Sequence, residues 1–476
     1  MMKYAPVVLA AGKGTRMRST VPKVLHPLAG LPMIAHVLQA LDEIPHTVAS
    51  APLQDTLTGA KPLVVVGFGA DEIERAFGDR CSYAVQEAQL GTGHAVMAAR
   101  RAIDAQQPRP EIVLVCYGDT PLISSEVLAR LLVEHVERGA TVTFLTAIAE
   151  QPSDFGRIVR GADGRAREIV EMKRATPEQK LLKEVNSGVY CFERAWLWSA
   201  LETLPRNPAG EYYLTDLVKI ASEQGRTVAT VTGSFSETIG INDRVQLAEA
   251  EQIMRRRVLE RLMYAGVTIT DPATTYIDAQ VEIGADSVIL PGTMITGKTR
   301  IGSFCRIGPG TNIDNSVLGD RCVVRNSALE GAILEECVSM GPFSHCRPGA
   351  HLAHNVRMGN FGEVKNSYVG PETDMHHFSY LGDATVGEHV NIGAGTITVN
   401  YDGVRKNPTT IGDEASIGSD TMLVAPVTVG EHATTGAGAV VTHDVPAWSI
   451  VAGVPARVLR MKEPPAGSQD EGGKKE

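Results

Sequence analysis

Two parts of the sequence combine residue types that can handle phosphorylated ligands. The first is a glycine-rich run at residues 12–16 (GKGTR), which follows the apolar stretch 6–11 and precedes Lys23. Backbone N–H groups of such a loop approach phosphate oxygens closely, Lys13 and Arg16 add positive charge, and Lys23 is a plausible second clamp. The run matches neither a Walker A loop nor GxGxxG. We expect a nucleotide phosphate site here; an ordinary strand-end turn with solvated basic side chains is the alternative.

Further polar loops follow in the first half of the chain. Residues 86–94 (QEAQLGTGH) combine amide side chains with a flexible backbone, which suits the edge of a nucleobase. Asp119 comes just after an apolar segment, where a magnesium ligand that serves a nucleotide would lie; otherwise it is a turn former. Residues 156–158 and 186–188 are polar loop pieces of the size that holds a sugar.

The second part lies between residues 345 and 401, where polar residues break an apolar pattern. Arg347 and Lys365 could hold a phosphate, Tyr380 could donate a hydrogen bond, and a histidine could take the proton of an ammonium group. This set fits a phosphorylated amino sugar. His376 and His377 compete for the role of base, and because neighbours on a strand face opposite ways, we expect only one to reach the site.

The second half owes its architecture to an apolar row with a period of six residues. Neither a helix nor an alternating strand has this period, so it predicts very short strands joined by tight corners. Frequent Gly, Asn and Asp between the row positions suit such corners. The pattern predicts a hexapeptide-repeat parallel β-helix. The row runs through Ile283, Ile289, Ile295, Ile301, Ile307 and Ile313, then with slips through Ala328, Leu334, Met340, Cys346, Leu352, Met358, Val364, Val369, Met375, Leu381, Val386 and Ile392, and finally Ile411, Ile417, Leu423 and Val429.

The first half alternates apolar strand segments with helical segments. Strands are expected at 6–11, 63–66, 112–115 and 141–147, with helices at 34–41 and 71–77, which predicts a doubly wound α/β domain with ligands at the carboxyl ends of its strands. Residues 242–265 read as a long amphipathic helix that Gly266 ends. We therefore expect a first domain at 1–241, a linker helix at 242–266, a β-helix at 267–460 and a disordered tail at 461–476. The repeat is interrupted at 400–408 (NYDGVRKNP), which predicts a projecting functional loop.

Composition narrows the cellular role. The formal net charge of −10 argues against binding to nucleic acid or an anionic membrane. Seven scattered Cys with no CxxC pair argue against a disulfide framework and favour a reducing cytoplasm. No apolar run is long enough for a signal peptide or for insertion into a membrane.

Several motifs carry a close resemblance. LAAGKGTRM, PKVL, QLGTGHA, YGD and EYYLTD are similar to those of the sugar-1-phosphate nucleotidylyltransferases. With the repeats, residues 5–455 resemble the family of bacterial bifunctional N-acetylglucosamine-1-phosphate uridylyltransferases and glucosamine-1-phosphate N-acetyltransferases. The resemblance implies a Rossmann-like domain, a left-handed β-helix and a homotrimer that supplies a cell-wall precursor. It implies acetylation of glucosamine-1-phosphate with acetyl-CoA, and then transfer of UMP from UTP with Mg²⁺, giving UDP-N-acetylglucosamine.

The same resemblance implies residue roles in the first domain. Arg16 and Lys23 would be catalytic by stabilising transition-state charge, Asp119 and Asn242 would bind Mg²⁺, and no general base is needed. The ligands of UTP and UDP-N-acetylglucosamine would be Leu9, Ala11, Gly12, Lys23, Gln86, Gln89, Gly91, Thr92, Tyr117, Gly118, Asp119, Gly156, Glu171, Asn186 and Asn242. Among these, Glu171 could instead be a solvated strand residue.

In the β-helix, the resemblance implies that His377 is the catalytic base. Arg347, Lys365, Tyr380 and Asn391 would hold the acetyl acceptor, and Ala394, Asn400, Tyr401, Ser419 and Ala437 would contact acetyl-CoA. The chain departs from the family at Gly453, where well-known members have an arginine for the coenzyme phosphates. Arg457 or a basic residue of another subunit would then replace it.

Three rival interpretations remain open. The β-helix could be a rod that assembles a trimer without catalysing anything. It could instead be a metalloenzyme of the carbonic-anhydrase-like type, with zinc bound by three of its histidines (345, 351, 354, 376, 377 and 389). The first domain could be an inactive sugar-nucleotide-binding regulatory domain.

Overall fold

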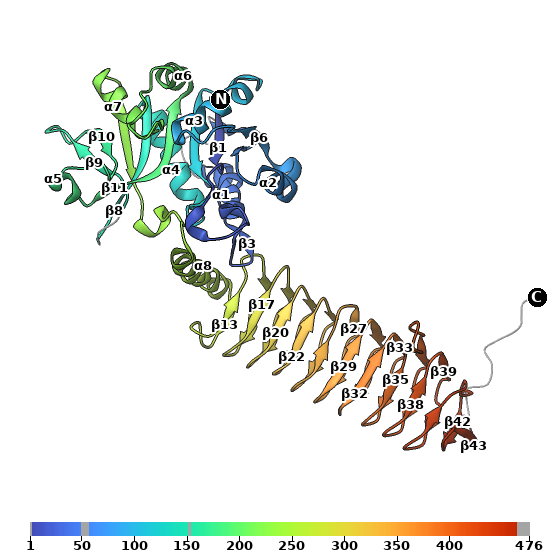
Figure 1. The fold of residues 1–476 in the computed structure, drawn as a ribbon. Helices are drawn as coiled ribbons and strands as arrows, with labels where there is room; N and C mark the ends of the chain where they lie inside the picture. Colours follow the sequence, from blue (N-terminus) through green and yellow to red (C-terminus); the bar gives the residue numbers. More distant parts are fainter. Residues whose placement is uncertain (1, 49–56, 151–153, 464–476) are drawn as a thin grey trace, which may run out of the picture. The chain divides into compact units, whose positions relative to one another are not determined.

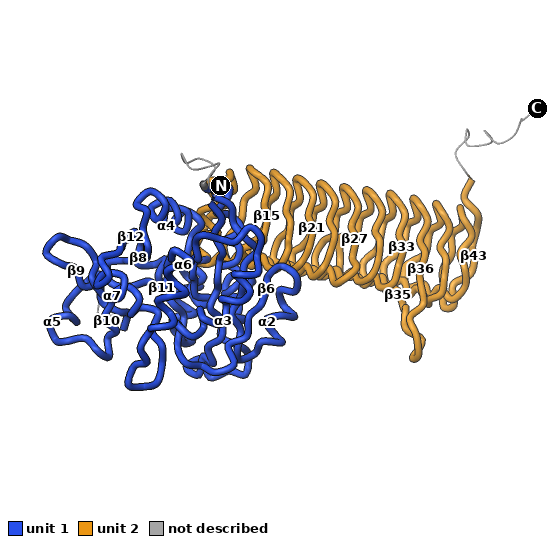
Figure 2. The backbone as a smooth tube through the Cα atoms, turned by 90° about the horizontal axis from the view of Figure 1, so that it is seen from above, with its two compact units in different colours: residues 1–254 blue, residues 255–476 orange. Residues whose placement is uncertain are grey.

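The computed structural model describes residues 2–48, 57–150 and 154–463. It divides into two compact units, residues 1–254, here called the head, and residues 255–476, here called the rod (Figure 2). The division falls inside helix α8 (Arg244–Tyr264), within the segment 242–266 singled out above. The predicted tail, 461–476, begins one residue too early, because Met461 is the last residue of strand β43; residues 464–476 fall outside the described residues.

Helix α8 begins and ends where its sequence dictates. The Asp243 carboxylate accepts hydrogen bonds from two N–H groups of the first turn, those of Val245 (3.0 Å) and Gln246 (2.9 Å). Gly266 follows the helix with a φ of 96°, a conformation that favours glycine. The amphipathic helix expected at 242–265 would bury its apolar residues on one side; Leu259 and Leu262 follow this pattern, whereas Val245, Ala248 and Met263 are exposed.

A single mixed sheet forms the centre of the head (Figure 1). Its main path runs in the order β10-β9-β11-β7-β1-β5-β6, with β4 beside β1, and with β8 between β11 and β12. Strands β1, β4, β5, β6 and β7 are mutually parallel, and β11 is antiparallel to β7 and β8. The strands are β1 (Met2–Leu9), β4 (Leu57–Gly59), β5 (Leu63–Val66), β6 (Ser82–Val85), β7 (Ile112–Tyr117), β8 (Val142–Ile148), β9 (Arg157–Arg160), β10 (Ala166–Val170), β11 (Glu184–Glu193) and β12 (Val228–Thr232), with a small hairpin of β2 (Pro27–Leu28) and β3 (Leu31–Pro32).

Helices cover both faces of this sheet. One apolar core lies under α3 (Thr92–Asp104), α6 (Arg194–Glu202) and α7 (Asp216–Glu223). A second core lies under α1 (Met33–Val48), α2 (Ala70–Phe77) and α4 (Ser125–Glu137). The short elements are α5 (Pro177–Lys180) and the 3₁₀ turns η1 (Thr15–Met17), η2 (Lys23–Leu25), η3 (Gly78–Arg80) and η4 (Phe235–Thr238). The predicted doubly wound α/β domain is confirmed. None of the helices in the described residues is long and apolar enough to span a membrane.

The rod is a parallel β-helix with three flat faces, as the six-residue period predicts (Figure 1). Its first face comprises β13 (Thr268–Ile269), β16 (Val288–Ile289), β19 (Arg306–Ile307), β22 (Val323–Val324), β25 (Ser339–Met340), β28 (Arg357–Met358), β31 (Asp374–Met375), β34 (Asn391–Ile392), β37 (Ser416–Ile417), β40 (Thr434–Thr435), β42 (Ser449–Ala452) and the antiparallel β43 (Arg457–Met461). Its second face comprises β14 (Tyr276–Ile277), β17 (Met294–Thr296), β20 (Asn312–Asp314), β23 (Ala328–Glu330), β26 (His345–Cys346), β29 (Gly362–Lys365), β32 (Ser379–Gly382), β35 (Ile397–Val399), β38 (Met422–Val424) and β41 (Val440–Val441). Its third face comprises β15 (Glu282–Ile283), β18 (Arg300–Ile301), β21 (Val317–Leu318), β24 (Ile333–Leu334), β27 (Ala350–Leu352), β30 (Ser367–Val369), β33 (Ala384–Val386), β36 (Thr409–Ile411) and β39 (Val427–Val429).

The predicted apolar row forms the core of the rod with one error. Ile307, Met340, Leu381 and the other row positions are buried. Ala328 is not buried, and Leu329 takes its place in the core. The spacing between buried residues shortens from six to five at this point, from Val324 to Leu329. A strict count of six therefore assigns the inward position to the wrong residue.

A buried histidine of α4 makes the stability of the head depend on pH. His135 is 4% exposed, its Nδ1 lies 3.0 Å from the Thr143 hydroxyl, and burial lowers its pKa to about 4. In the unfolded chain the imidazole takes up a proton near pH 6.5. The unfolded state therefore binds more protons between about pH 6.5 and 4, and the free energy of unfolding falls as pH drops through that window, by at most about 1.4 kcal/mol per pH unit.

Urea unfolding followed by the fluorescence of Trp196 and Trp198 in the head, in a Trp448→Phe background, measures this dependence. The slope of stability against pH between 7.5 and about 5 should be smaller in His135→Gln than in the parent. Identical slopes in the two proteins would contradict the assignment to His135.

Candidate active sites

A pocket of about 320 Å³ opens in the head where predicted nucleotide residues converge. Nine of the residues singled out from the sequence line it: Leu9, Ala11, Gly12, Gln86, Gln89, Gly91, Thr92, Tyr117 and Asp119. Two further lining residues, Ala95 and Glu211, were not predicted. Glu211 opens the EYYLTD motif, and this segment packs on the loop before α3, with Tyr212 N–H donating to the carbonyl of Leu90 at 2.8 Å.

The parallel strands explain this convergence. Leu9 ends β1 and Tyr117 ends β7, and the two residues are direct partners in the sheet. Gly118 N–H continues the ladder by donating to the Leu9 carbonyl at 2.9 Å. The glycine-rich loop and Asp119 therefore leave neighbouring strands at the same carboxyl edge, which is where ligands of such sheets bind.

Lys23 lies between the two predicted metal ligands. Its Nζ makes a very short ion pair with Oδ2 of Asp119 and lies 3.2 Å from Oδ1 of Asn242. The side chains of Lys23 and Asp119 are only 12% and 19% exposed. The other carboxylate oxygen, Oδ1 of Asp119, is buried and has no hydrogen-bond partner. The structure thus brings together an ammonium group and the side-chain oxygens of two residues from distant parts of the chain.

A glycine in the phosphate loop makes room for this lysine. Gly14 has a φ of 57°, and a Cβ atom at that position would lie 2.6 Å from Cβ of Lys23. Any side chain at residue 14 would therefore displace Lys23. Arg16, by contrast, is exposed on η1 and does not line the pocket, so its predicted role stays a prediction.

The loop before α3 is tied to the phosphate loop. Gln89 donates from Nε2 to the Ala11 carbonyl at 2.8 Å, and Gln86 donates to the Gly91 carbonyl at 3.1 Å. Thr92 begins α3, and its hydroxyl oxygen accepts from Leu214 N–H at 3.1 Å. These two hydrogen bonds to backbone carbonyls fix the side-chain amides of Gln86 and Gln89 at the wall of the pocket.

The three predicted sugar ligands also come together. Asn186 N–H donates to the Gly156 carbonyl at 2.9 Å, and the Glu171 carboxyl carbon lies 3.7 Å from where a Cβ of Gly156 would be. Glu171 accepts from the Thr215 hydroxyl at 3.1 Å. Burial is the main cause that raises the pKa of Glu171, and the nearby Asp216 carboxylate adds to it. Glu171 is therefore a half-buried, hydrogen-bonded carboxyl group, unlike the solvated strand residue that was the alternative.

On the rod, the predicted acceptor residues lie on or beside the second face. Tyr380 on β32 pairs with Glu363 on β29, and Arg347, which follows β26, binds that Glu363 at 2.9 Å. Lys365, at the end of β29, lies close enough to Arg347 for the positive charges to interact. Asn391 lies on the first face, paired with Asp374. Neighbouring coils thus bring Arg347, Lys365 and Tyr380 together, whereas Asn391 lies on a different face of the rod.

The two adjacent histidines differ in their partners. Both are exposed and lie after β31, at the corner between the first and second faces, so strand alternation does not separate them. Nε2 of His376 lies 3.4 Å from Oδ1 of Asp374. His377 makes no side-chain hydrogen bond or ion pair with another residue of the described chain. Only His377 therefore has both ring nitrogens available.

The predicted coenzyme residues form a column along this same corner. Gly395 N–H donates to the Phe378 carbonyl at 2.7 Å, Asp420 N–H to Ala394 at 2.6 Å, and Gly438 N–H to Ser419 at 2.8 Å. Ala394, Ser419 and Ala437 therefore occupy successive coils next to His377. Gly453 has a φ of 98°, a conformation that favours glycine. Arg457 is exposed and pairs with Ala452 in the hairpin of β42 and β43.

The interruption of the repeat is a small hairpin that stands out from the rod between β35 and β36 (Figure 2). Tyr401 bridges to Lys406, and Asn400 Nδ2 donates to Asp383 at 2.6 Å, which anchors the base of the hairpin. The Lys406 side chain is the main cause that lowers the pKa of Lys365. Lys406 thus adds a second ammonium group beside Lys365, a feature that the sequence did not reveal because the residues lie 41 positions apart.

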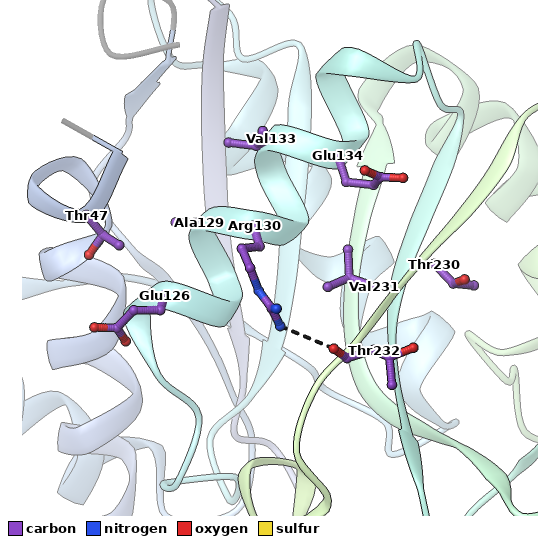
Figure 3. Close-up of a pocket in the computed structure, with 9 residues that line it drawn as sticks. All are labelled: Thr47, Glu126, Ala129, Arg130, Val133, Glu134, Thr230, Val231 and Thr232. Carbon is purple, nitrogen blue, oxygen red and sulfur yellow. Dashed lines mark hydrogen bonds between the residues drawn. The ribbon is translucent and has the colours of Figure 1, made fainter. Parts of the chain in front are cut away.

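Other features of the described chain do not match the predicted chemistry. A roomier cavity of about 490 Å³ lies between α4 and β12, where Arg130 donates to the Thr232 carbonyl at 3.2 Å (Figure 3), but no predicted residue lines it. Within residues 2–48, 57–150 and 154–463, no group of three His, Cys, Asp or Glu side chains is placed to hold a metal ion. The zinc interpretation of the rod therefore gains no support from its geometry.

Comparison with known proteins agrees with this division. Residues 6–211 match the MobA-like NTP transferase domain, and residues 408–443 match the bacterial transferase hexapeptide (six repeats). The chain is 47% identical to the Bifunctional protein GlmU of an Exiguobacterium species, over 94% of this chain and 96% of the relative. It is 46% identical to that of Heliobacterium modesticaldum (97% and 98%) and 47% to that of Geobacillus thermodenitrificans (95% and 96%). The chain therefore belongs to the GlmU family of bifunctional proteins, as an enzyme with a nucleotidyltransferase head and a hexapeptide-repeat acetyltransferase rod.

Proposed function

We propose that the rod acetylates glucosamine-1-phosphate with acetyl-CoA and that the head then transfers UMP from UTP to the product, at the two residue sets described above. The observation that carries the proposal for the head is the position of Lys23 between the oxygens of Asp119 and Asn242 at a pocket lined by nine predicted nucleotide residues. For the rod, the observation is the position of His377, which has no side-chain partner in the described chain, next to the column formed by Ala394, Ser419 and Ala437.

In the head, an oxygen of the sugar phosphate attacks the α-phosphorus of UTP. A new P–O bond forms as the bond to the β-phosphate oxygen breaks, and pyrophosphate leaves. The reaction needs alignment and charge neutralisation more than a base. Gly156, Glu171 and Asn186 orient the sugar, and Lys23, with Arg16 from the phosphate loop, neutralises phosphate charge.

The residues present fit a magnesium ion. The buried Oδ1 of Asp119 has no hydrogen-bond partner, and Oδ2 of Asp119 and Oδ1 of Asn242 already hold a cationic group, the Lys23 ammonium. Two protein oxygens suit Mg²⁺, which keeps several waters and binds substrate phosphates. When bound, Mg²⁺ supplies charge neutralisation to the phosphate oxygens.

In the rod, the neutral amine of glucosamine-1-phosphate attacks the thioester carbon of acetyl-CoA. The C–N bond forms, the C–S bond breaks and the coenzyme thiolate leaves. The imidazole of His377 accepts the proton that the nitrogen loses. Arg347 and Lys365 bind the sugar phosphate, while Tyr380 and Asn391 hold the sugar. Asn400, Tyr401 and the backbone of the corner column bind the coenzyme, and exposed Arg457 is the candidate for its phosphates.

Lys406 is expected to strengthen binding of the acetyl acceptor. Lys406→Ala removes the ammonium beside Lys365, and loss of one charge-assisted contact to phosphate should raise KM for glucosamine-1-phosphate about 10- to 100-fold, with a smaller effect on KM for acetyl-CoA. The neighbouring Arg405→Ala, which loses only an exposed pair with Asp402, is the matched control. An equal rise in KM in both variants would contradict a specific role for Lys406.

We further infer a homotrimer. The proposed acetyl site lies on the outer surface of the rod and needs walls. At the same corner, Phe343, Phe361 and Phe378 occupy consecutive coils and are 60%, 58% and 56% exposed, so an apolar column is available to a second copy. Sedimentation of the full chain should give three copies, and a monomer with full acetyl transfer would refute the inference. The seven unpaired cysteines support a location in the reducing cytoplasm.

One experiment tests the whole proposal. The protein is supplied with glucosamine-1-phosphate, acetyl-CoA, UTP and Mg²⁺, and the products are separated by chromatography. UDP-N-acetylglucosamine and pyrophosphate should appear. If the product formed only when N-acetylglucosamine-1-phosphate was supplied, the rod would be a scaffold alone. If neither sugar phosphate gave product, the head would be a binding domain.

A further inference from the structure

An arginine-rich cavity of about 350 Å³ lies in the head, apart from the nucleotide pocket. The C-terminal end of α4, the turn between β9 and β10, and the turn between α7 and β12 enclose it. Five arginines line it, namely Arg138, Arg160, Arg165, Arg167 and Arg226, and none of them lines the nucleotide pocket. We call this cavity the arginine pocket.

The arginine pocket has more positive than negative side chains. Glu134 binds Arg138 at 2.9 Å, and Glu184 binds Arg160 through two hydrogen bonds of 2.6 and 2.7 Å. Asp163 binds Arg167 at 2.7 Å. Three carboxylates therefore face five guanidinium groups, in a chain whose net charge is −10. Such a local excess of positive charge in an acidic protein attracts small anions.

Two of the guanidinium groups are available to a ligand. The Arg165 side chain is 79% exposed, and its Nε reaches only to 3.9 Å from Asp163, which Arg167 already binds. Arg226 is exposed, and its side chain makes no hydrogen bond or ion pair with another residue of the described chain. The Ser222 hydroxyl lies beside them in the lining as a neutral donor. The arginines that bind carboxylates stabilise the walls of the pocket, and the guanidinium groups of Arg165 and Arg226 remain available to bind an anion.

We propose that the arginine pocket binds a small oligophosphate. Planar guanidinium groups donate two parallel hydrogen bonds to phosphate oxygens, so several arginines around one cavity favour phosphate over a single carboxylate. A cavity of about 350 Å³ holds more than one phosphate group. The oligophosphate could be free pyrophosphate or tripolyphosphate, or the triphosphate of a nucleotide.

The arginine pocket is separate from the proposed sugar site. Strands β9 and β10 form a hairpin in which Arg157 pairs with Val170 and Arg160 pairs with Ala166. Gly156 and Glu171 adjoin the open end of this hairpin, whereas Gly164 and Arg165 lie in its turn. A ligand in the arginine pocket therefore contacts the end opposite to the sugar residues.

Calorimetric titration of the full chain with inorganic tripolyphosphate tests the proposal. Arg165→Ala/Arg226→Ala should weaken binding at one site per chain at least about tenfold, while Lys23→Ala, which alters the nucleotide pocket, should leave that site intact. The control Arg75→Ala/Arg101→Ala removes the same charge from exposed positions on α2 and α3. Circular dichroism and the Arg165→Gln/Arg226→Gln variant exclude misfolding as the cause.

Parallel titrations identify the source of the phosphate. Tighter binding of tripolyphosphate than of orthophosphate and citrate supports the proposal; comparison with UTP then distinguishes a free oligophosphate from a nucleotide. Unchanged binding in Arg165→Ala/Arg226→Ala, an equal loss in the control variant, or equal binding of citrate and tripolyphosphate would each overturn it.

Discussion

His377→Ala is expected to lower kcat of acetyl transfer about 10²- to 10⁴-fold and to leave UMP transfer unchanged. The attacking amine of glucosamine-1-phosphate must lose a proton as it forms the amide, and His377 is the exposed imidazole without a partner at the start of the coenzyme column. The rod and the head have separate apolar cores, and His377 lies on the rod, so the substitution should leave the nucleotide pocket of the head unchanged. The rate of acetyl transfer is measured from the release of the coenzyme thiol, and the rate of UMP transfer is measured from the release of pyrophosphate.

The neighbouring histidine provides the control for this prediction. His376 is also exposed, but its ring contacts Asp374, which also holds Arg357 through hydrogen bonds of 2.5 and 2.6 Å. His376→Ala should therefore change acetyl transfer much less than His377→Ala does. A larger loss in His376→Ala would transfer the role of base to that residue. Loss of both activities in a folded His377→Ala protein would refute the division into two sites.

The rod was predictable from sequence because its signal is repetitive. Each coil buries one aliphatic side chain per face, so the period appears in the sequence without knowledge of long-range contacts. Ala328 shows the limit of this reasoning. Where two successive buried positions are five residues apart instead of six, the inward position is one residue away from the one that the period predicts. Only the packing of Leu329 against neighbouring coils then decides which residue is buried.

The nucleotide pocket was predictable for a different reason. Motifs at residues 9–12, 86–92 and 117–119 each follow a strand, and parallel strands bring their carboxyl ends to one edge. Glu211 follows no strand of the sheet path and reaches the pocket only because its segment packs on the loop before α3. The EYYLTD motif was recognised, but its position in the pocket depends on tertiary packing.

Side-chain contacts on the surface of the rod could not be predicted from sequence patterns. Alternation along a strand was expected to distinguish His376 from His377, yet both lie at a corner, and the contact of His376 with Asp374 distinguishes them instead. Lys406, in the inserted hairpin, interacts with Lys365 across 41 positions of sequence, a contact that no local pattern encodes.

Asp119→Ala is expected to lower kcat of UMP transfer at least about 10³-fold and to leave acetyl transfer unchanged. Oδ2 of Asp119 holds the ammonium of Lys23, and Oδ1 is a buried acceptor without a partner. The alanine variant removes both oxygens and leaves Lys23, 12% exposed, without its carboxylate. Both the position of the lysine and the capacity to bind a divalent cation should be lost.

Binding measurements separate these two consequences from catalysis itself. Calorimetric titration with Mg²⁺ in the presence of UTP should show weaker metal binding in Asp119→Ala than in the parent. Asp71→Ala, which removes an exposed carboxylate from the first turn of α2, should bind Mg²⁺ and transfer UMP normally. Normal UMP transfer in Asp119→Ala would contradict its assigned role.

Asp119→Asn then distinguishes charge from shape. Asparagine keeps a neutral oxygen that can accept from Lys23, so a purely structural role for Asp119 would be satisfied by the amide. A role in binding Mg²⁺ and in balancing the Lys23 ammonium needs the negative charge, and Asp119→Asn should then lose UMP transfer almost as completely as Asp119→Ala while unfolding at nearly the parent temperature. Recovery of UMP transfer in Asp119→Asn would show that Asp119 only positions Lys23, and the metal would have to bind elsewhere in the pocket.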